Sequence, residues 1–287
     1  MPINEYFSQS TEYPERIGGF ELSPKSIFVV GKLPKDAPMV AIVGTRKCTP
    51  YGAEVARQFA SELARAGVVI VSGLAYGIDS IAQRAAVEAG GRTVAVLAHG
   101  LDHIYPSTNR DLAVRILATG GGLVSTYPKG TKALKHHFIE RNWLIAALSD
   151  GTVIAESTVT GGSLHTAKYT LEIGGALMAV PGSIYDETSA GTNNLIRNGA
   201  IPVTSSSDVL QAIGVPAGLI PASVIRAQNP HEEKIMSYLE KHRTKGGKTQ
   251  DLIEATRLNA AEFASVVSLM EITGKVRNLG GGRWGHR

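Results

Sequence analysis

The sequence has little cysteine, since Cys48 is the single one among 287 residues. One thiol cannot form an intramolecular disulfide or a cysteine-rich zinc site, which suits a reducing compartment. The chain also lacks an apolar stretch of roughly 18 residues and an apolar segment near its start, which argues against a membrane-spanning helix and a secretory leader. These absences predict a cytoplasmic protein with no membrane partner.

Several enzymatic signatures are also absent. The histidines show no H-E-x-x-H spacing, which argues against a bound metal. No G-x-G-x-x-G follows the first predicted strand, and the second strand ends in Ser72-Gly73, where a dinucleotide site carries an acid. Ser163 is not a nucleophile elbow, because position 165 is His165 rather than glycine. The sequence therefore predicts no metal, no cofactor and no catalytic residue.

The charge is unevenly distributed, although the formal net charge is only +4. Residues 1–225 hold 18 basic and 18 acidic side chains, whereas residues 226–287 hold 11 and 7. A basic tail indicates nucleic acid or another anionic surface, although a solvated helix face has the same composition.

From Met39 onward, short β-branched runs alternate with longer amphipathic segments, which is typical of an α/β parallel sheet with helices on both faces. The predicted strands are 39–44, 68–73, 93–98, 151–156 and 176–182, with a last short one at 200–203. Thr49 and Pro50 begin the first predicted helix, which ends before Gly67, and later helices are predicted over 78–89, 108–119, 140–148 and 162–173. Ser207-Asp208 is predicted to cap a short helix that ends at Ile213.

The pattern changes after residue 214. Segment 215–230 contains several prolines and few charges, which predicts a linker. Residues 231–287 predict three short helices and a hairpin that turns at Gly280-Gly281-Gly282, which is a winged-helix arrangement. The predicted organisation is an extension packed on the main domain (1–38), the main domain (39–214), the linker (215–230) and a winged-helix domain (231–287).

Three glycine-rich turns follow predicted strands, where backbone N–H groups at helix starts can bind phosphate. Such turns converge at the carboxyl edge of a parallel sheet. The candidate phosphate-binding residues are Gly44, Thr45, Arg46 and Lys47 in the first turn, Ser72 and Gly73 in the second, and Gly161, Gly162, Ser163, Thr166 and Lys168 in the third.

Segment 129–143 mixes cations with aromatic rings. Single-stranded nucleic acid requires that mixture, because bases stack on rings while Lys and Arg follow the backbone. Lys135 and Arg141 are the candidate cations. Phe138 fits a stacking role and a core role equally, whereas Trp143, which is followed by LIAAL, fits a core role.

The motifs together resemble the DNA-processing protein A family, also called DprA or Smf. They are VAIVGTR (40–46), VSGLAYGID (71–79), LDHIYPSTNRDL (101–112), FIERNWLIAALS (138–149), ESTVTGGSLHTA (156–167) and AVPGSIYDETSAGTNNLIRNGA (179–200). The resemblance implies an extended Rossmann-like fold, a homodimer, binding of single-stranded DNA, and loading of RecA recombinase onto incoming DNA during natural transformation. It carries binding roles to Arg46, to Phe138, Arg141 and Asn142 of the F-x-x-R-N segment, and to Gly162, Ser163 and Thr166 of the G-S-x-x-T loop. The chain departs from the family pattern at Thr126, Trp143 and Gly161.

Three hypotheses follow. The first is a non-catalytic mediator that binds single-stranded DNA in the main domain. The second is a nucleotide sensor or an enzyme similar to cytokinin-activating phosphoribohydrolases, although their catalytic Glu falls at Tyr169 here and Glu172 lies one turn further. In the third, the main domain is only a scaffold, and the tail binds duplex DNA or a partner protein.

Overall fold

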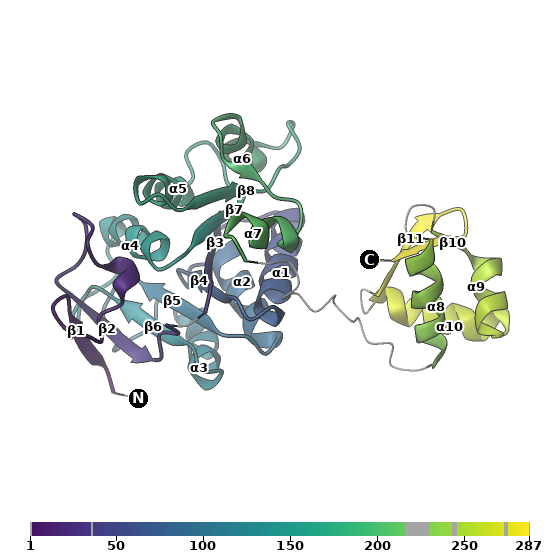
Figure 1. Cartoon of the computed structure of the whole chain (residues 1–287), viewed down its shortest axis with the longest axis horizontal. Helices are drawn as coiled ribbons and strands as arrows, with labels where there is room; N and C mark the ends of the chain where they lie inside the picture. The colour runs from purple at the N-terminus through teal and green to yellow at the C-terminus, as the bar shows by residue number, and fades with distance from the viewer. Residues whose placement is uncertain (1, 36, 216–229, 243–245, 273–274, 287) are drawn as a thin grey trace. The chain divides into compact units, whose positions relative to one another are not determined.

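The computed structural model describes residues 2–35, 37–215, 230–242, 246–272 and 275–286 (Figure 1). The chain divides into two compact units, residues 1–221 and 222–287. The predicted linker, 215–230, lies almost entirely outside the described residues.

A nine-stranded sheet forms the centre of the N-terminal unit in the part of the chain that the structure describes. Its strands, in spatial order, are β1 (Asn4–Phe7), β2 (Ser26–Gly31), β6 (Gly122–Ser125), β5 (Thr93–Leu97), β4 (Val69–Ser72), β3 (Met39–Gly44), β7 (Gly151–Glu156), β8 (Ala176–Ala179) and β9 (Ile201–Pro202). Every pair from β6 to β9 is parallel. The predicted α/β class is therefore confirmed.

At one edge the sheet has two antiparallel strands that the sequence did not predict. There, β2 pairs antiparallel with β6, and β1 pairs antiparallel with β2. Residues 1–38 thus add two strands to the sheet. The sequence offers little signal for β6, because four residues that begin with Gly122 are too short for a periodicity to show.

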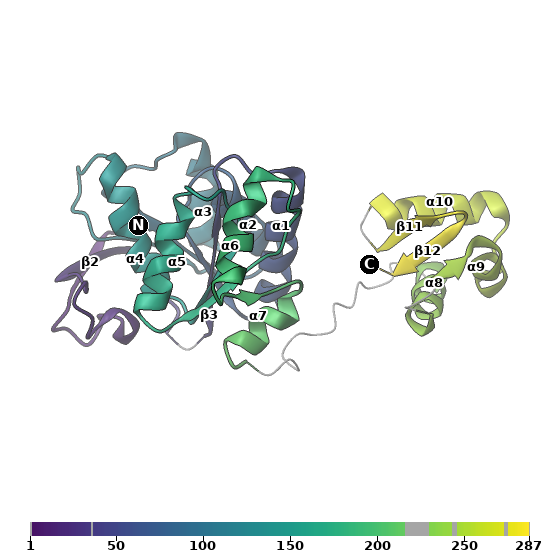
Figure 2. The same cartoon turned by 90° about the horizontal axis from the view of Figure 1, so that it is seen from above.

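Helices cover both faces of this sheet (Figures 1 and 2). One face packs against α1 (Pro50–Arg65), α2 (Ile78–Glu88), α3 (Arg110–Ala118) and α7 (Ser206–Ala212), and the other against α4 (Lys135–Ala147), α5 (Ser163–Glu172) and α6 (Glu187–Arg197). The central strands alternate between the two cores, since Val40 and Ile42 lie in one while Ala41 and Val43 lie in the other. Burial on both faces explains why the central strands are largely apolar.

Two helix starts differ from the prediction. The cap of α7 is Ser205, whose side chain accepts from the Asp208 N–H at 3.2 Å in a capping box, rather than Ser207. The helix predicted over 140–148 begins earlier, at Lys135. Phe138, Arg141 and Asn142 therefore lie at i, i+3 and i+4 on one helix and share a face.

The C-terminal unit contains α8 (Pro230–Lys241), β10 (Gly247–Lys248), α9 (Thr249–Thr256), α10 (Ala260–Ile272), β11 (Val276–Gly280) and β12 (Arg283–His286). The predicted helices and the hairpin at Gly280–Gly282 are confirmed, and β10 joins the hairpin in a sheet of order β10-β12-β11. All three turn glycines have positive φ, at 82°, 57° and 69°, which other residues rarely adopt. The order of helices and strands is that of a winged helix.

Candidate functional site

A cleft of about 580 Å³ opens at the carboxyl edge of the large sheet, beside the ends of β3 and β7. The chain order reverses at this point, because β4, β5 and β6 follow on one side of β3 while β7, β8 and β9 follow on the other. Open α/β sheets bind their ligands at such a switch point. The topology alone therefore makes this cleft the candidate site.

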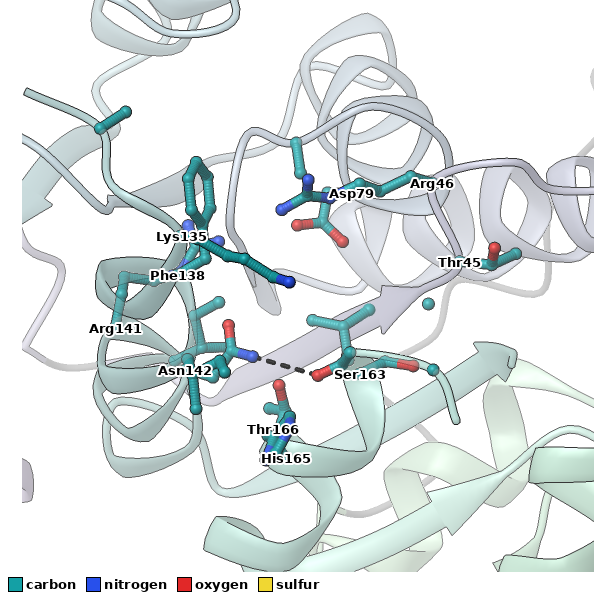
Figure 3. Close-up of a pocket in the computed structure, with 18 of the residues that line it drawn as sticks. Thr45, Arg46, Asp79, Lys135, Phe138, Arg141, Asn142, Ser163, His165 and Thr166 are labelled. Carbon is teal, nitrogen blue, oxygen red and sulfur yellow. Dashed lines mark hydrogen bonds between the residues drawn. The ribbon is translucent and has the colours of Figure 1, made fainter. Parts of the chain in front are cut away.

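The cleft brings together predicted residues from segments far apart in the sequence (Figure 3). The first glycine turn, the start of α4 and the loop before α5 all contribute. The predicted residues that line it are Gly44, Thr45, Arg46, Lys135, Phe138, Arg141, Asn142, Gly161, Gly162, Ser163 and Thr166.

Four predicted residues do not line the cleft. The buried Ser72 hydroxyl donates to the Ile42 carbonyl oxygen at 2.7 Å, and so joins two strands. Gly73 leaves room for a neighbour, because a Cβ there would lie 2.5 Å from the guanidinium of Arg141. Lys168 forms an exposed ion pair with Glu172 at 3.5 Å, and Lys47 is exposed beside the cleft.

An aromatic and cationic cluster forms one wall of the cleft. The guanidinium carbon of Arg46 lies 4.8 Å from the ring centroid of Phe138, and that of Arg141 lies 5.8 Å from it. The ring of Tyr105 meets Phe138 edge-on, with centroids 6.1 Å apart. Such cation–π contacts hold the guanidinium groups beside the ring. Phe138 is thus a wall residue, while Trp143 is 5% exposed and belongs to the core as predicted.

The two arginines of this cluster have different environments. Arg46 is exposed, whereas Arg141 is 4% exposed and donates through Nη1 to the carbonyl oxygens of Gly73, at 2.7 Å, and of Val96. Burial lowers the pKa of Arg141 to about 10, so it stays charged at neutral pH. Arg141 therefore supports the ends of β4 and β5 from beneath the cleft.

Asp79 at the start of α2 is the one acid among the described residues that line the cleft. Its carboxylate accepts from the Gly73 N–H at 3.0 Å. Burial raises the pKa of Asp79, while the positive charges of Arg141 and Arg46 act in the opposite direction. The acid is thus partly neutralised by the arginines around it, and the wall as a whole favours an anion.

The start of α1 is already occupied by a carboxylate of the chain itself. Glu156, 1% exposed at the end of β7, accepts from the N–H of Thr49 at 2.9 Å and from its hydroxyl at 2.6 Å. A negative charge is stabilised at a helix N-terminus. The first glycine turn therefore offers a ligand the side chains of Thr45 and Arg46 rather than the N–H groups of α1.

The loop before α5 is tied to α4 across the floor of the cleft. The Asn142 amide donates to the Gly162 carbonyl oxygen at 3.2 Å (Figure 3). The buried Ser163 hydroxyl donates to Ser157 at 3.0 Å, which holds the loop to the end of β7. Gly162 is exposed, and a Cβ there would meet nothing within 4 Å, so its backbone faces open space.

Sequence reasoning did not select Tyr105, Asp79 or His165 as site residues, although all three line the cleft. Tyr105 is 50% exposed and lies in the loop that follows β5. Its N–H donates to His99 Nε2 at 3.3 Å, which holds the loop in place. The sequence did contain a signal for Tyr105, namely an aromatic residue shortly after a parallel strand. Such a position lies at the carboxyl edge of the sheet, where the cleft opens.

The described ranges lack a metal-binding cluster and a membrane-spanning helix. No group of three or more His, Cys, Asp or Glu side chains there could hold a metal ion. In the same residues, no helix is both long enough and apolar enough to cross a membrane.

Comparison with known proteins identifies relatives of the N-terminal unit. The DNA recombination-mediator protein A family model matches residues 5–214. The DNA processing protein DprA of Bacillus subtilis (strain 168) is 38% identical over 213 residues, which cover 74% of this chain and 71% of that protein.

Two solved structures are similar to the chain. DNA processing protein A from Streptococcus pneumoniae matches with a TM-score of 0.67 and 37% identity, covering 73% of this chain and 74% of that one. DNA processing protein A from Helicobacter pylori, studied for its single-stranded DNA binding mode, matches with a TM-score of 0.65 and 32% identity, covering 74% and 95%. The family match spans most of the chain and includes the segments that line the cleft. The chain therefore belongs to the DNA recombination-mediator protein A family.

Proposed function

We propose that this protein is a recombination mediator without catalytic activity and that its cleft binds single-stranded DNA. The observation that carries the proposal is the Phe138 ring with Arg46 and Arg141 beside it in one cleft. Bases stack on aromatic faces, whereas guanidinium and ammonium groups follow the phosphates. The single-stranded DNA binding of the Helicobacter pylori relative supports the same ligand.

The cleft assigns different roles to its cations. Arg46 and Lys135 are exposed and point into the cleft, so they are the proposed phosphate contacts (Figure 3). Arg141 is buried beneath the ring and contributes mainly by its charge and by holding the wall. Phe138 and Tyr105 are the proposed stacking residues. A positive cleft thus exists in a unit whose charges sum to about zero, because most of its acids lie elsewhere.

The wider role is also part of the proposal. Family membership supports loading of RecA recombinase onto single-stranded DNA, a homodimer and a role in DNA uptake in the cytoplasm. Light scattering of the purified chain tests the homodimer, for which twice the mass of one chain is expected. RecA-dependent strand exchange on DNA coated with single-strand binding protein tests the loading, which should be faster when this protein is present.

Titration of a labelled single strand by fluorescence anisotropy, repeated over a salt series, tests the cleft. Arg46→Ala should weaken binding and lower the slope of log K against log salt by about 0.7, the value for one phosphate contact on a single strand. Phe138→Ala should weaken binding with little change in slope, because stacking releases no counterions. Arg65→Ala is the matched control, since this exposed cation ends α1 at the opposite edge of the sheet. Wild-type titrations for both cleft variants would contradict the proposal.

Two further experiments separate the competing hypotheses. Removal of residues 226–287 should leave single-strand binding in place if the cleft carries it, and should abolish it if the tail does. An enzyme would release a free base from nucleoside monophosphates, and we expect none. Glu172, the candidate acid of that hypothesis, is paired with Lys168 on an exposed face of α5 and does not line the cleft.

A further inference from the structure

In the C-terminal unit, α9 and α10 form the helix-turn-helix pair with which a winged helix usually reads DNA. Neither helix carries a cation. Neither α9 nor α10 contains a lysine or an arginine, and both carry acids. Glu254 in α9 and Glu262 and Glu271 in α10 are exposed. Winged-helix and helix-turn-helix proteins that read DNA use basic and polar side chains on the second of these helices. The exposed face of α10 therefore repels a phosphate backbone.

The sheet of the same unit has the opposite charge. Its three strands contain no acidic residue, and Lys248, Arg277 and Arg283 lie on them. Lys248 is directly opposite Arg283, and Arg277 is directly opposite Gly285. Because residues alternate between faces along a strand, the three cations share one face, here called the wing face.

Other contacts place this face outward. Trp284, between Arg283 and Gly285, packs toward the core of the unit and donates through Nε1 to Thr249 Oγ1 at 3.1 Å. A Cβ built on Gly285 would lie 3.3 Å from Nε of Arg277, which confirms that Arg277 lies over that glycine. Arg277 and Lys248 are both exposed.

The glycine turn and a buried ion pair hold the wing face in position. The Gly282 carbonyl oxygen accepts from the N–H of Thr249 at 2.9 Å and from its hydroxyl at 3.0 Å, which fixes the turn beside Lys248. At the other end of the hairpin, Lys275 is 5% exposed and pairs with Glu232 of α8 at 2.6 Å. Lys275 thus anchors β11 and is not part of the wing face.

We propose that the C-terminal unit binds the phosphate backbone of duplex DNA with the wing face, while α9 and α10 point away from the DNA. A duplex presents one negative charge per about 1.7 Å of its axis, a dense array that suits several cations on one sheet face. Contacts with phosphates carry no sequence information, so this binding is independent of sequence. The proposal goes beyond the cleft, which binds single strands in the other unit.

The test measures binding of a labelled duplex to the full-length protein over a salt series. The variant Lys248→Gln/Arg277→Gln should weaken binding and lower the slope of log K against log salt by about 2, because each duplex phosphate contact contributes about 0.9. The matched control, Lys234→Gln/Lys241→Gln, removes the same charge from exposed positions of α8 and should bind as the wild type does.

Wild-type duplex binding by the Lys248→Gln/Arg277→Gln variant would overturn the proposal. An equal loss of duplex affinity in both double variants would also overturn it, because binding would then respond to net charge alone. A short single strand that fits the cleft reports on the other unit, and the wing-face variant should bind it normally. Loss of that binding in the cleft variants, with duplex binding retained, would show that the two sites are separate.

Discussion

Replacement of Arg141 should affect folding more than any other change in the cleft. This side chain is 4% exposed and donates to two buried carbonyl oxygens, those of Gly73 and Val96. In Arg141→Met the side chain keeps an unbranched apolar stem but loses its donors and its charge. The two carbonyl oxygens then lose the guanidinium donor, and Asp79 loses the charge that opposes its desolvation.

The size of the effect follows from these contacts. A hydrogen bond to a charged group contributes about 1.5–3 kcal/mol, and removal of one partner of a buried charge pair costs about 3–5 kcal/mol. These contributions overlap, because the same guanidinium supplies all of them. We therefore expect Arg141→Met to lower the free energy of unfolding of the N-terminal unit by about 3–5 kcal/mol.

Urea denaturation followed by tryptophan fluorescence measures this loss. Trp143 is buried in the N-terminal unit, and a Trp284→Phe background removes the signal of the other unit. The exposed Arg46 supplies the control, since Arg46→Met should leave the midpoint unchanged while weakening DNA binding. Asp79→Asn/Arg141→Met should recover part of the loss, because the uncompensated carboxylate is gone. An Arg141→Met midpoint equal to that of the wild type would refute a supporting role.

Three further predictions concern other contacts. Tyr105→Ala should weaken single-strand binding about tenfold in anisotropy titrations, since stacking is worth about 1–3 kcal/mol per base, whereas Tyr105→Phe should bind normally. Burial lowers the pKa of His99. Its contribution to stability is therefore complete above the unfolded-state pKa of about 6.5 and is lost as pH falls through the folded-state pKa. Thermal melts over a pH series should show this loss, and the pH dependence should disappear in His99→Gln. Lys275→Met should destabilise the C-terminal unit by about 3 kcal/mol in urea denaturation, because the buried Glu232 loses the ammonium group that pairs with it, whereas a paired change of both residues to Met should cost much less.

Much of the architecture follows from local sequence. The strands from β3 to β8 are buried on both faces, so an unbroken apolar run is enough to locate most of them. Glycine turns after these strands must lie at the carboxyl edge, which predicts where a ligand site forms before any contact is known. Arg46 and Gly162 were located in this way, Phe138 was located from its cationic neighbours, and all three line the cleft.

Long-range contacts determine the rest, because they depend on which segments meet rather than on residue type. Arg46 and Arg141 look alike in the sequence, but one reaches solvent while the other lies beneath Gly73. Glu156 occupies the start of α1 from a strand more than a hundred residues away. The basic excess of the tail is visible in composition, yet its concentration on one sheet face depends on the register of three short strands.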